Sequence, residues 1–171
     1  CLGIDKNICT SVKEIVLCYS KGIIYDGRDD LNDFKKHLAK VTNKLKRQGT
    51  LKGALEGADA FIGVSKGNLL TANDIRLMNE NSIVFAMANP VPEIMPDEAR
   101  KVAAVVGTGR SDYPNQINNS LAFPGVFRGA LDSKAVLINN EMKIAAAHAL
   151  SKCVNPTKDH ILPYTLDKQV V

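Results

Sequence analysis

SIVFAMANPVPE, residues 82–93, begins as an apolar run and changes abruptly into a turn rich in proline. The run SIVFAMA (82–88) has the length of a strand, and its consecutive apolar positions would bury both faces of that strand. Strands of this kind occur in parallel sheets that are covered by helices. The segment therefore predicts a buried parallel strand that ends next to Asn89.

Three further apolar runs have the same character: EIVLCY (14–19), DAFIGVS (59–65) and AAVVGTG (103–109). Capped or amphipathic segments that are typical of helices separate the runs. They are DLNDFKKHLAKV (30–41), TLKGALEGA (50–58), TANDIRLMNE (71–80), MPDEARKVA (95–103) and NEMKIAAAHALSKC (140–153). The alternation predicts an α/β fold with a Rossmann-like, doubly wound and mainly parallel sheet. We expect its strands at 14–19, 59–64, 82–88 and 104–108, and a long helix over 140–152.

The length and composition suit one ordinary domain, or a large part of one, and argue against several other classes of protein. The 171 residues are 45% hydrophobic and 23% charged, which is enough for a core. The net charge of +4 arises largely from a lysine-rich stretch without stacking aromatics, so we expect a solvated helix face and no nucleic-acid partner. No apolar run approaches the roughly 20 residues of a membrane span, and no signal peptide is visible. The cysteines lack CxxC spacing, so we expect reduced thiols and a cytoplasmic location.

Small residues and amides follow three of the predicted strands. Gly63 and Ser65 follow the second strand, Asn89 follows the third, and GTGRSDYPNQINN (107–119) follows the fourth. In parallel α/β sheets, ligands bind beyond the carboxyl ends of the strands. Amides both donate and accept hydrogen bonds, so they suit ribose hydroxyls, a carboxamide or a carboxylate. The pattern indicates a bound nucleotide, with ordinary turns as the alternative for any single piece.

The glycine motif GxGxxG, which receives the pyrophosphate of a dinucleotide, is absent from the sequence. Either the nucleotide hypothesis is wrong, or the motif lies upstream of Cys1. The chain also starts at Cys1 without an initiator methionine. We therefore expect an N-terminally truncated fragment whose sheet lacks its first strand and its Gly-rich turn.

Five segments closely resemble, in the same order, the C-terminal NAD(P)-binding region of malic enzymes of the bacterial type. They are KGIIYDGRDDLN (21–32), GADAFIGVSKG (57–67), IVFAMANPVPEIMPDEA (83–99), GTGRSDYPNQINNSLAFPGVFRGALD (107–132) and NEMKIAAAHAL (140–150). The resemblance runs from about residue 12 to residue 152. It implies oxidative decarboxylation of malate to pyruvate and CO2 with NAD or NADP, dependent on Mg²⁺ or Mn²⁺. It also implies a homo-oligomer when the protein is full length.

The resemblance assigns roles to the residues at the strand ends. It implies that Asn89 and Asn119 bind the substrate. The amides of 115–119 would hold a carboxylate and a carboxamide without changing protonation. The residues implied to bind the cofactor are Gly63, Val64, Ser65, Asn89, Asn118 and Asn119. For Asn119 the alternative is a cap on a helix that starts near residue 120.

The remaining chemistry of the family is expected outside this chain. The catalytic lysine and tyrosine and the three carboxylate metal ligands would precede Cys1, so no catalytic or metal-binding residue is expected here. Residues 1–153 would then be the C-terminal part of the NAD(P)-binding domain. Residues 154–171 would be an extended tail that packs on the missing N-terminal part, and the isolated chain would be inactive. The alternatives are a non-catalytic nucleotide-binding or interaction module, and another dehydrogenase of the amino-acid-dehydrogenase-like fold, which the pairing of ANPVPE with NQINN disfavours.

Some positions depart from the family or have simpler explanations. Tyr19 stands where many members carry an acid for the adenosine ribose, while Ser20 and Lys21 would tolerate a 2′-phosphate, so the choice between NAD and NADP stays open. Residues 1–11 match the family poorly. Four acidic side chains are expected to complement helix N-termini. For Asp29 and Asp30 the alternative is metal binding, and for Glu93 and Asp97 it is general acid catalysis.

Overall fold

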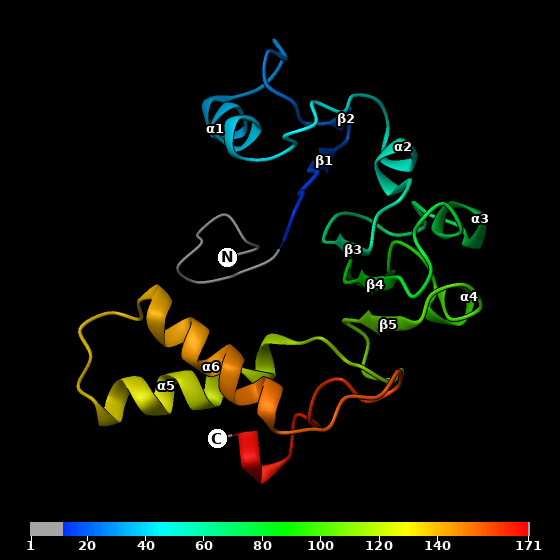
Figure 1. Ribbon diagram of the computed structural model, residues 1–171. Coiled ribbons are helices and arrows are strands. Elements are labelled where there is room, and N and C mark those ends of the chain that lie inside the picture. Colours follow the sequence, from blue (N-terminus) through cyan, green and yellow to red (C-terminus); the bar gives the residue numbers. More distant parts are fainter. Residues whose placement is uncertain (1–11, 171) are drawn as a thin grey trace. The chain divides into compact units, whose positions relative to one another are not determined.

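The computed structural model describes residues 12–170, and the poorly matching residues 1–11 lie outside this range (Figure 1). The chain divides into two compact units, Cys1–Ala58 and Asp59–Val171. Each unit forms most of its contacts within itself, and each is described separately below. The hydrophobic pattern of the sequence does not reveal a boundary after residue 58.

The first unit contains a small hairpin and two helices. Strands β1 (Cys18–Tyr19) and β2 (Gly22–Ile23) pair antiparallel, with Cys18 opposite Ile23. The helices are α1 (Asp33–Val41) and α2 (Leu51–Leu55). Helix α1 begins after Asn32, whose side chain accepts a hydrogen bond from the Lys35 N–H at 2.9 Å. The core of this unit is formed by Ile24, Leu31 and Ala39, against which Leu17 and Tyr19 pack.

The prediction that residues 14–19 join the parallel sheet is wrong. Only Cys18 and Tyr19 of this run are in a strand, and their partner is the next strand of a hairpin. Gly22 allows the reversal because its φ is +98°, and a Cβ at this position would lie 2.2 Å from the Gly49 carbonyl oxygen. A short apolar run carries no information about the direction of the strand that pairs with it. Here the reversal at Gly22 makes the next strand antiparallel.

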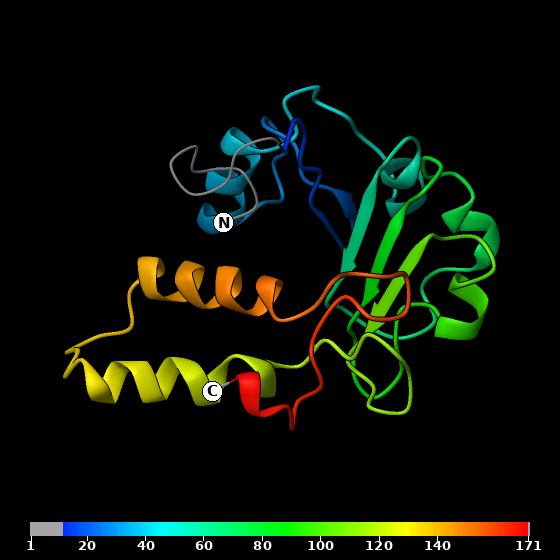
Figure 2. The same ribbon diagram turned by 60° about the horizontal axis from the view of Figure 1, so that its bottom comes forward.

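The second unit is built on a parallel three-stranded sheet, as predicted. Its strands are β3 (Ala60–Gly63), β4 (Ile83–Ala86) and β5 (Val105–Thr108), and their order in the sheet is β3-β4-β5. Two short helices connect them, α3 (Ala72–Ile75) and α4 (Pro96–Ala99). Figure 2 shows α3 and α4 beside the same face of the sheet, which is what two right-handed crossovers produce. Both helices are shorter than the predicted segments 71–80 and 95–103.

The two faces of this sheet are buried to different extents. On the face covered by α3 and α4, the side chains of Val84, Ala86 and Val106 are almost fully buried. On the other face, Ile62 is 44% exposed and Ile83 is 36% exposed. The expected burial on both faces is therefore observed on one face only within residues 12–170.

Two longer helices follow the sheet and lie side by side in both views (Figures 1 and 2). They are α5 (Phe123–Asp132), preceded by the short 3₁₀ helix η1 (Asn119–Leu121), and α6 (Asn140–Lys152). The predicted long helix over 140–152 is thereby confirmed. Its N-terminus is capped by Asn139, whose side chain accepts a hydrogen bond from the Met142 N–H at 2.9 Å. Proline and glycine interrupt the apolar pattern of α5, so a helix in this region was considered only as part of the alternative for Asn119.

The C-terminal segment after α6 folds back on the loop that follows β5. It makes a turn in which Thr157 and His160 exchange backbone hydrogen bonds of 3.1 and 3.2 Å. It ends in the 3₁₀ helix η2 (Lys168–Val170). Packing of residues 154–171 on a further domain stays a prediction. Among the described residues, no helix combines the length and the apolar character needed to cross a bilayer.

Candidate functional site

The three parallel strands end in one row. Gly63, Ala86 and Thr108 are aligned across the sheet, and each is the last residue of its strand. The residues that follow them therefore leave the sheet at the same edge, which is where parallel α/β proteins bind ligands. The loop after β5 returns to this edge, because the Ile117 N–H donates to the Thr108 carbonyl at 2.7 Å. Asn118 and Asn119 follow directly.

The predicted binding residues at this edge differ in how accessible they are. Val64 is 76% exposed, and Ser65, Asn89 and Asn119 are also exposed. Asn118 is half-buried. The exposed amides of Asn89 and Asn119 are free to meet a ligand, since neither makes a side-chain hydrogen bond within the described part of the chain.

Glu93 has a role that sequence reasoning did not anticipate. It is fully buried at 0% exposure, and its two carboxyl oxygens accept backbone hydrogen bonds from two different strand ends. Oε1 accepts from the Ser65 N–H at 2.8 Å, and Oε2 accepts from the Ala88 N–H at 3.0 Å. The expectation that Glu93 complements a helix N-terminus is wrong, because α4 starts only at Pro96 and the carboxyl group points at the strand ends instead.

The small size of Gly63 is required by Glu93. A Cβ at Gly63 would lie 2.4 Å from the carboxyl carbon of Glu93, well inside van der Waals contact. The backbone carbonyl of Glu93 also accepts hydrogen bonds from the N–H groups of Leu69 and Leu70, at 2.8 and 3.0 Å. The loops that follow β3 and β4 are therefore joined into one hydrogen-bonded assembly, with Glu93 at its centre.

Asn115 contradicts the expectation that all amides of 115–119 face a ligand. It is buried at 7% exposure with a φ of 58°, and every polar group of its side chain is used internally. Its Nδ2 donates to the carbonyls of Val106 and Lys158, at 2.9 and 2.8 Å. Its Oδ1 accepts from the Ile161 N–H at 3.0 Å. Asn115 therefore joins β5 to the C-terminal segment and is not available to a ligand.

Asn118 and Asn119 differ in role, because the first caps a helix and the second is exposed. The Asn118 side chain accepts from the Ser120 N–H at 3.0 Å and caps η1, whereas Asn119 is the first residue of that helix. The alternative in which Asn119 acts as the cap is therefore wrong, because the helix begins one residue earlier than that alternative requires. The ligand-binding role of both residues stays a prediction.

Tyr19 belongs to a charged cluster in the first unit. It is the residue that stands where many members of the family carry an acid. Its hydroxyl donates to Asp30 Oδ2 at 2.8 Å, and Asp30 also pairs with Arg28 at 2.7 Å and with Lys21 at 3.1 Å. The hydrogen bonds from Tyr19, Arg28 and Lys21 hold the pKa of the Asp30 carboxyl group well below its usual value. The ammonium group of Lys35 lies 3.9 Å from the centre of the Tyr19 ring.

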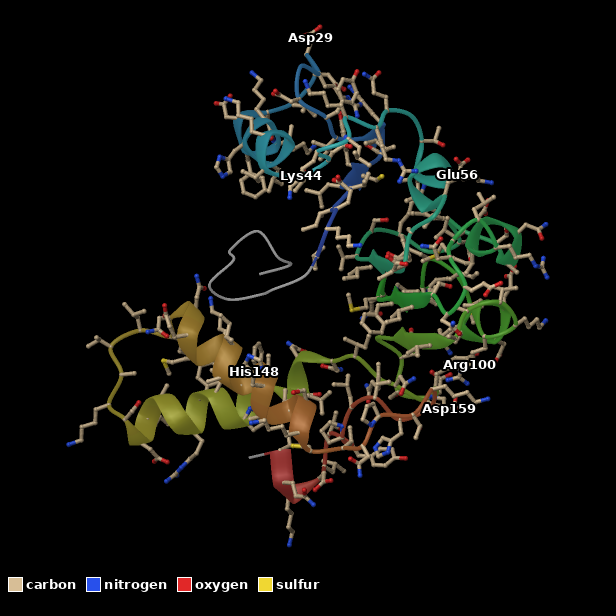
Figure 3. The ribbon with its side chains drawn as sticks, viewed as in Figure 1. Asp29, Lys44, Glu56, Arg100, His148 and Asp159 are labelled. Carbon is tan, nitrogen blue, oxygen red and sulfur yellow. The ribbon has the colours of Figure 1, made fainter. Side chains whose placement is uncertain are left out.

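The expected role of Asp29 and Asp30 at a helix start is also wrong, because α1 begins at Asp33. Asp30 instead anchors the cluster around Tyr19. Figure 3 places Asp29 at the tip of the loop before α1, with its side chain directed away from the ribbon.

Replacing Asp30 by asparagine is expected to lower the melting temperature at pH 7, since the three partners of the carboxylate lose its charge. A carboxyl group whose folded pKa is depressed stabilises the fold above its unfolded pKa of about 3.9 and loses this contribution as the pH falls. The difference between wild type and Asp30→Asn should therefore shrink between pH 5 and pH 2, as thermal unfolding would show. Asp29→Asn is the matched control; a difference that stays constant over this pH range would contradict the assignment.

A cluster of metal-binding side chains is not assembled in the described residues. Within residues 12–170, no cluster of three or more His, Cys, Asp or Glu side chains is placed to hold a metal ion. His148 is exposed on α6 (Figure 3), and His37 is exposed on α1. The location of catalytic and metal-binding residues outside this chain stays a prediction.

The parallel sheet, the helices α3 and α4 on one of its faces and the polar residues at the carboxyl ends of its strands define a Rossmann-like α/β domain (Figure 2). The family model described as "Malic enzyme, NAD binding domain" matches residues 5–168. The chain belongs to this family.

Several characterised relatives are similar to the chain. The bifunctional malic/malolactic enzyme of Bacillus subtilis is 52% identical over 164 residues, which are 93% of this chain and 40% of the relative. The NAD-dependent malic enzyme of Geobacillus stearothermophilus is 43% identical over 96% of this chain and 35% of its own length. The crystal structure of the NAD-dependent malic enzyme of Thermotoga maritima superposes with a TM-score of 0.88 at 42% identity, covering 93% of this chain and 43% of that chain. The chain thus spans less than half the length of each of these relatives.

Proposed function

We propose that this chain is the nucleotide-binding part of a malic enzyme that converts malate to pyruvate and CO2 with NAD or NADP. The observation that carries the proposal is the row of strand ends at Gly63, Ala86 and Thr108, next to which the exposed amides of Asn89 and Asn119 lie. The family membership, together with relatives that are named as NAD-dependent and NADP-dependent malic enzymes, supports the same reaction.

The residues at this edge fit a nicotinamide dinucleotide and a dicarboxylic acid. Gly63 itself is buried, but Val64 and Ser65 expose the turn that follows it, so a flat ligand can approach the end of β3. The bound nicotinamide would supply the hydride acceptor. The amide of Asn119 would donate a hydrogen bond to a malate carboxylate, and the amide of Asn89 would orient the substrate and the carboxamide. Both amides keep one protonation state at all ordinary pH values, so they can orient a ligand without exchanging protons with it.

Residues 12–170 provide no group of three or more His, Cys, Asp or Glu side chains placed to hold the metal ion of the reaction. We propose that the Mg²⁺ or Mn²⁺ ligands and the proton-transferring lysine and tyrosine are supplied by a preceding part of the same enzyme. This chain then contributes positioning, through Asn89 and Asn119, and no proton transfer of its own.

Exposed apolar residues indicate where further polypeptide would pack. Ile62 and Ile83 are exposed on the open face of the sheet, and Phe123, Phe127 and Leu131 are exposed along α5 at a spacing of four residues. We propose that the N-terminal part of the enzyme covers some of these residues and that the complete protein forms a homo-oligomer. We place the enzyme in the cytoplasm, where thiols such as Cys18 and Cys153 stay reduced.

The 171-residue chain alone is expected to show no malate-dependent reduction of NAD or NADP, because it lacks the metal ligands and the proton-transfer pair that lower the barrier. The longest form of the protein that its source produces is expected to be active with Mg²⁺ or Mn²⁺. Absorbance at 340 nm measures both, and a metal-free reaction is the control.

Turnover by the purified 171-residue chain would contradict the proposal that the catalytic residues lie elsewhere. If the longest natural form binds nucleotide but does not oxidise malate, the protein is a non-catalytic nucleotide-binding module instead.

A further inference from the structure

Two of the three strand ends at the candidate site share one buried carboxyl group, that of Glu93. Ser65 follows β3 and Ala88 follows β4, so the two N–H groups that donate to Glu93 belong to different loops at the ligand-binding edge. Both bonds are of ordinary length, 2.8 and 3.0 Å, and the side chain is shielded completely from water. A bond of this kind is strong because no solvent competes for either partner.

The neighbours of Ser65 and Ala88 are the residues that are expected to meet the ligand. Val64 precedes Ser65, and Asn89 follows Ala88 directly in the chain. A shift of the Ala88 N–H therefore moves the Asn89 backbone, while a shift of the Ser65 N–H moves the turn that faces the cofactor. Each loop donates to one oxygen of the same carboxyl group. The fixed distance between these two oxygens therefore sets the spacing between the two loops.

We infer that Glu93 is a positioning residue for nucleotide binding: it holds the Ser65 turn and the Asn89 loop at the separation that the ligand requires. This inference rests on the proposed function. Glu93 contacts no ligand itself, because it lies beneath Gly63 and is fully buried. Glu93 acts on the ligand indirectly, through the backbone N–H groups that donate to its carboxyl group. Its backbone carbonyl also accepts from the N–H groups of Leu69 and Leu70, in the loop after β3.

Glu93→Gln is compared with wild type in two proteins, the 171-residue chain and the longest natural form. Glutamine keeps the shape but turns one acceptor into an NH2 donor, so one of the two backbone N–H groups loses its partner. Glu98→Gln is the matched control. Glu98 also accepts a backbone hydrogen bond at 2.8 Å, from the Ala72 N–H, but this donor is the first residue of α3 and neither Ser65 nor Ala88.

Dissociation constants for NADH and NADPH are measured by fluorescence titration at a temperature at which circular dichroism shows every variant folded. For Glu93→Gln we expect a rise of roughly ten- to a hundredfold, the factor in affinity to which the loss of one buried hydrogen bond corresponds. Glu98→Gln should change these constants less than about twofold even where its unfolding temperature falls. Hydrogen exchange at the amide of Ser65 or Ala88 should accelerate in Glu93→Gln, and at neither in Glu98→Gln.

Glu93→Asp carries the test if the glutamine variant does not fold. Aspartate keeps both oxygens but is one methylene shorter, so it can reach only one of the two N–H groups. Exchange should then accelerate at a single amide, and the dissociation constants should rise more than in Glu98→Gln.

Three results have distinct meanings. If wild type binds NADH or NADPH and Glu93→Gln binds equally well, the inference is overturned and the proposed function stands. If the glutamine and aspartate variants lose no more affinity than Glu98→Gln, the role of Glu93 is confined to stability and the inference is again overturned. If wild type in its longest natural form binds neither nucleotide, the proposed function fails and the inference fails with it.

Discussion

Replacing Asn119 by alanine in the longest natural form of the protein is expected to lower kcat/KM for malate by about ten- to a hundredfold. The physical reason is the loss of one charge-assisted hydrogen bond to a substrate carboxylate, which contributes about 1.5–3 kcal/mol. We expect both a higher KM and a lower kcat, because the substrate is held less tightly and is aimed less well at the hydride acceptor. Steady-state kinetics at saturating nucleotide would measure the two constants separately.

The free energy of unfolding should hardly change in Asn119→Ala, since the side chain is exposed and makes no hydrogen bond within the described part of the chain. Asn118→Ala is the matched control at the neighbouring position. Its side chain caps η1, so its loss should cost about 1 kcal/mol of stability. Unchanged kcat and KM for malate in Asn119→Ala would contradict the proposal that Asn119 binds the substrate, whether or not the free energy of unfolding changes.

Asn115→Ala is expected to destabilise the second unit by about 3–5 kcal/mol. The substitution removes three side-chain hydrogen bonds, one buried and two part-buried, each worth about 1 kcal/mol net. It leaves the Val106 and Lys158 carbonyls and the Ile161 N–H without this partner. Alanine also tolerates the φ of 58° poorly, which adds roughly 1 kcal/mol. Urea unfolding monitored by circular dichroism would measure the change.

Asn81→Ala separates the cost of the backbone conformation from the cost of the hydrogen bonds. Asn81 has a similar φ of 61° but is exposed. We therefore expect this control to lose only about 1 kcal/mol, the cost of left-handed backbone for alanine. Equal losses in the two variants would show that the side-chain hydrogen bonds of Asn115 contribute little, contrary to the structure.

The parallel strands β3, β4 and β5 could be predicted because their signal is local. Each is a short apolar run that ends in small or polar residues, and hydrophobic periodicity depends only on neighbouring positions. The hairpin of β1 and β2 has a similar apolar run at 14–19, but its pairing direction depends on the reversal at Gly22 and on a contact with Gly49. The same local pattern therefore gave a correct prediction for three strands and a wrong one for the fourth.

The candidate site was predicted to the same limited extent. The position of the site at the strand ends follows from the order of strands and turns, and Asn89 and Asn119 are exposed there. The sequence did not distinguish amides that are free from amides that are used internally. Asn115 and Asn119 stand four residues apart in one polar stretch, yet Asn115 is buried and Asn119 is exposed.

The sequence by itself determined the α/β class, the parallel core strands, the long helix α6 and the family, because each of these depends on local periodicity or on contiguous motifs. Only the tertiary structure decided the roles of Glu93 and Asn115. Glu93 accepts from Ser65, 28 residues earlier, and Asn115 bonds to Lys158 and Ile161, 43 and 46 residues later. A buried polar side chain needs hydrogen-bond partners. Which partners it has depends on the elements that folding brings together, so they cannot be predicted from spacing within the sequence.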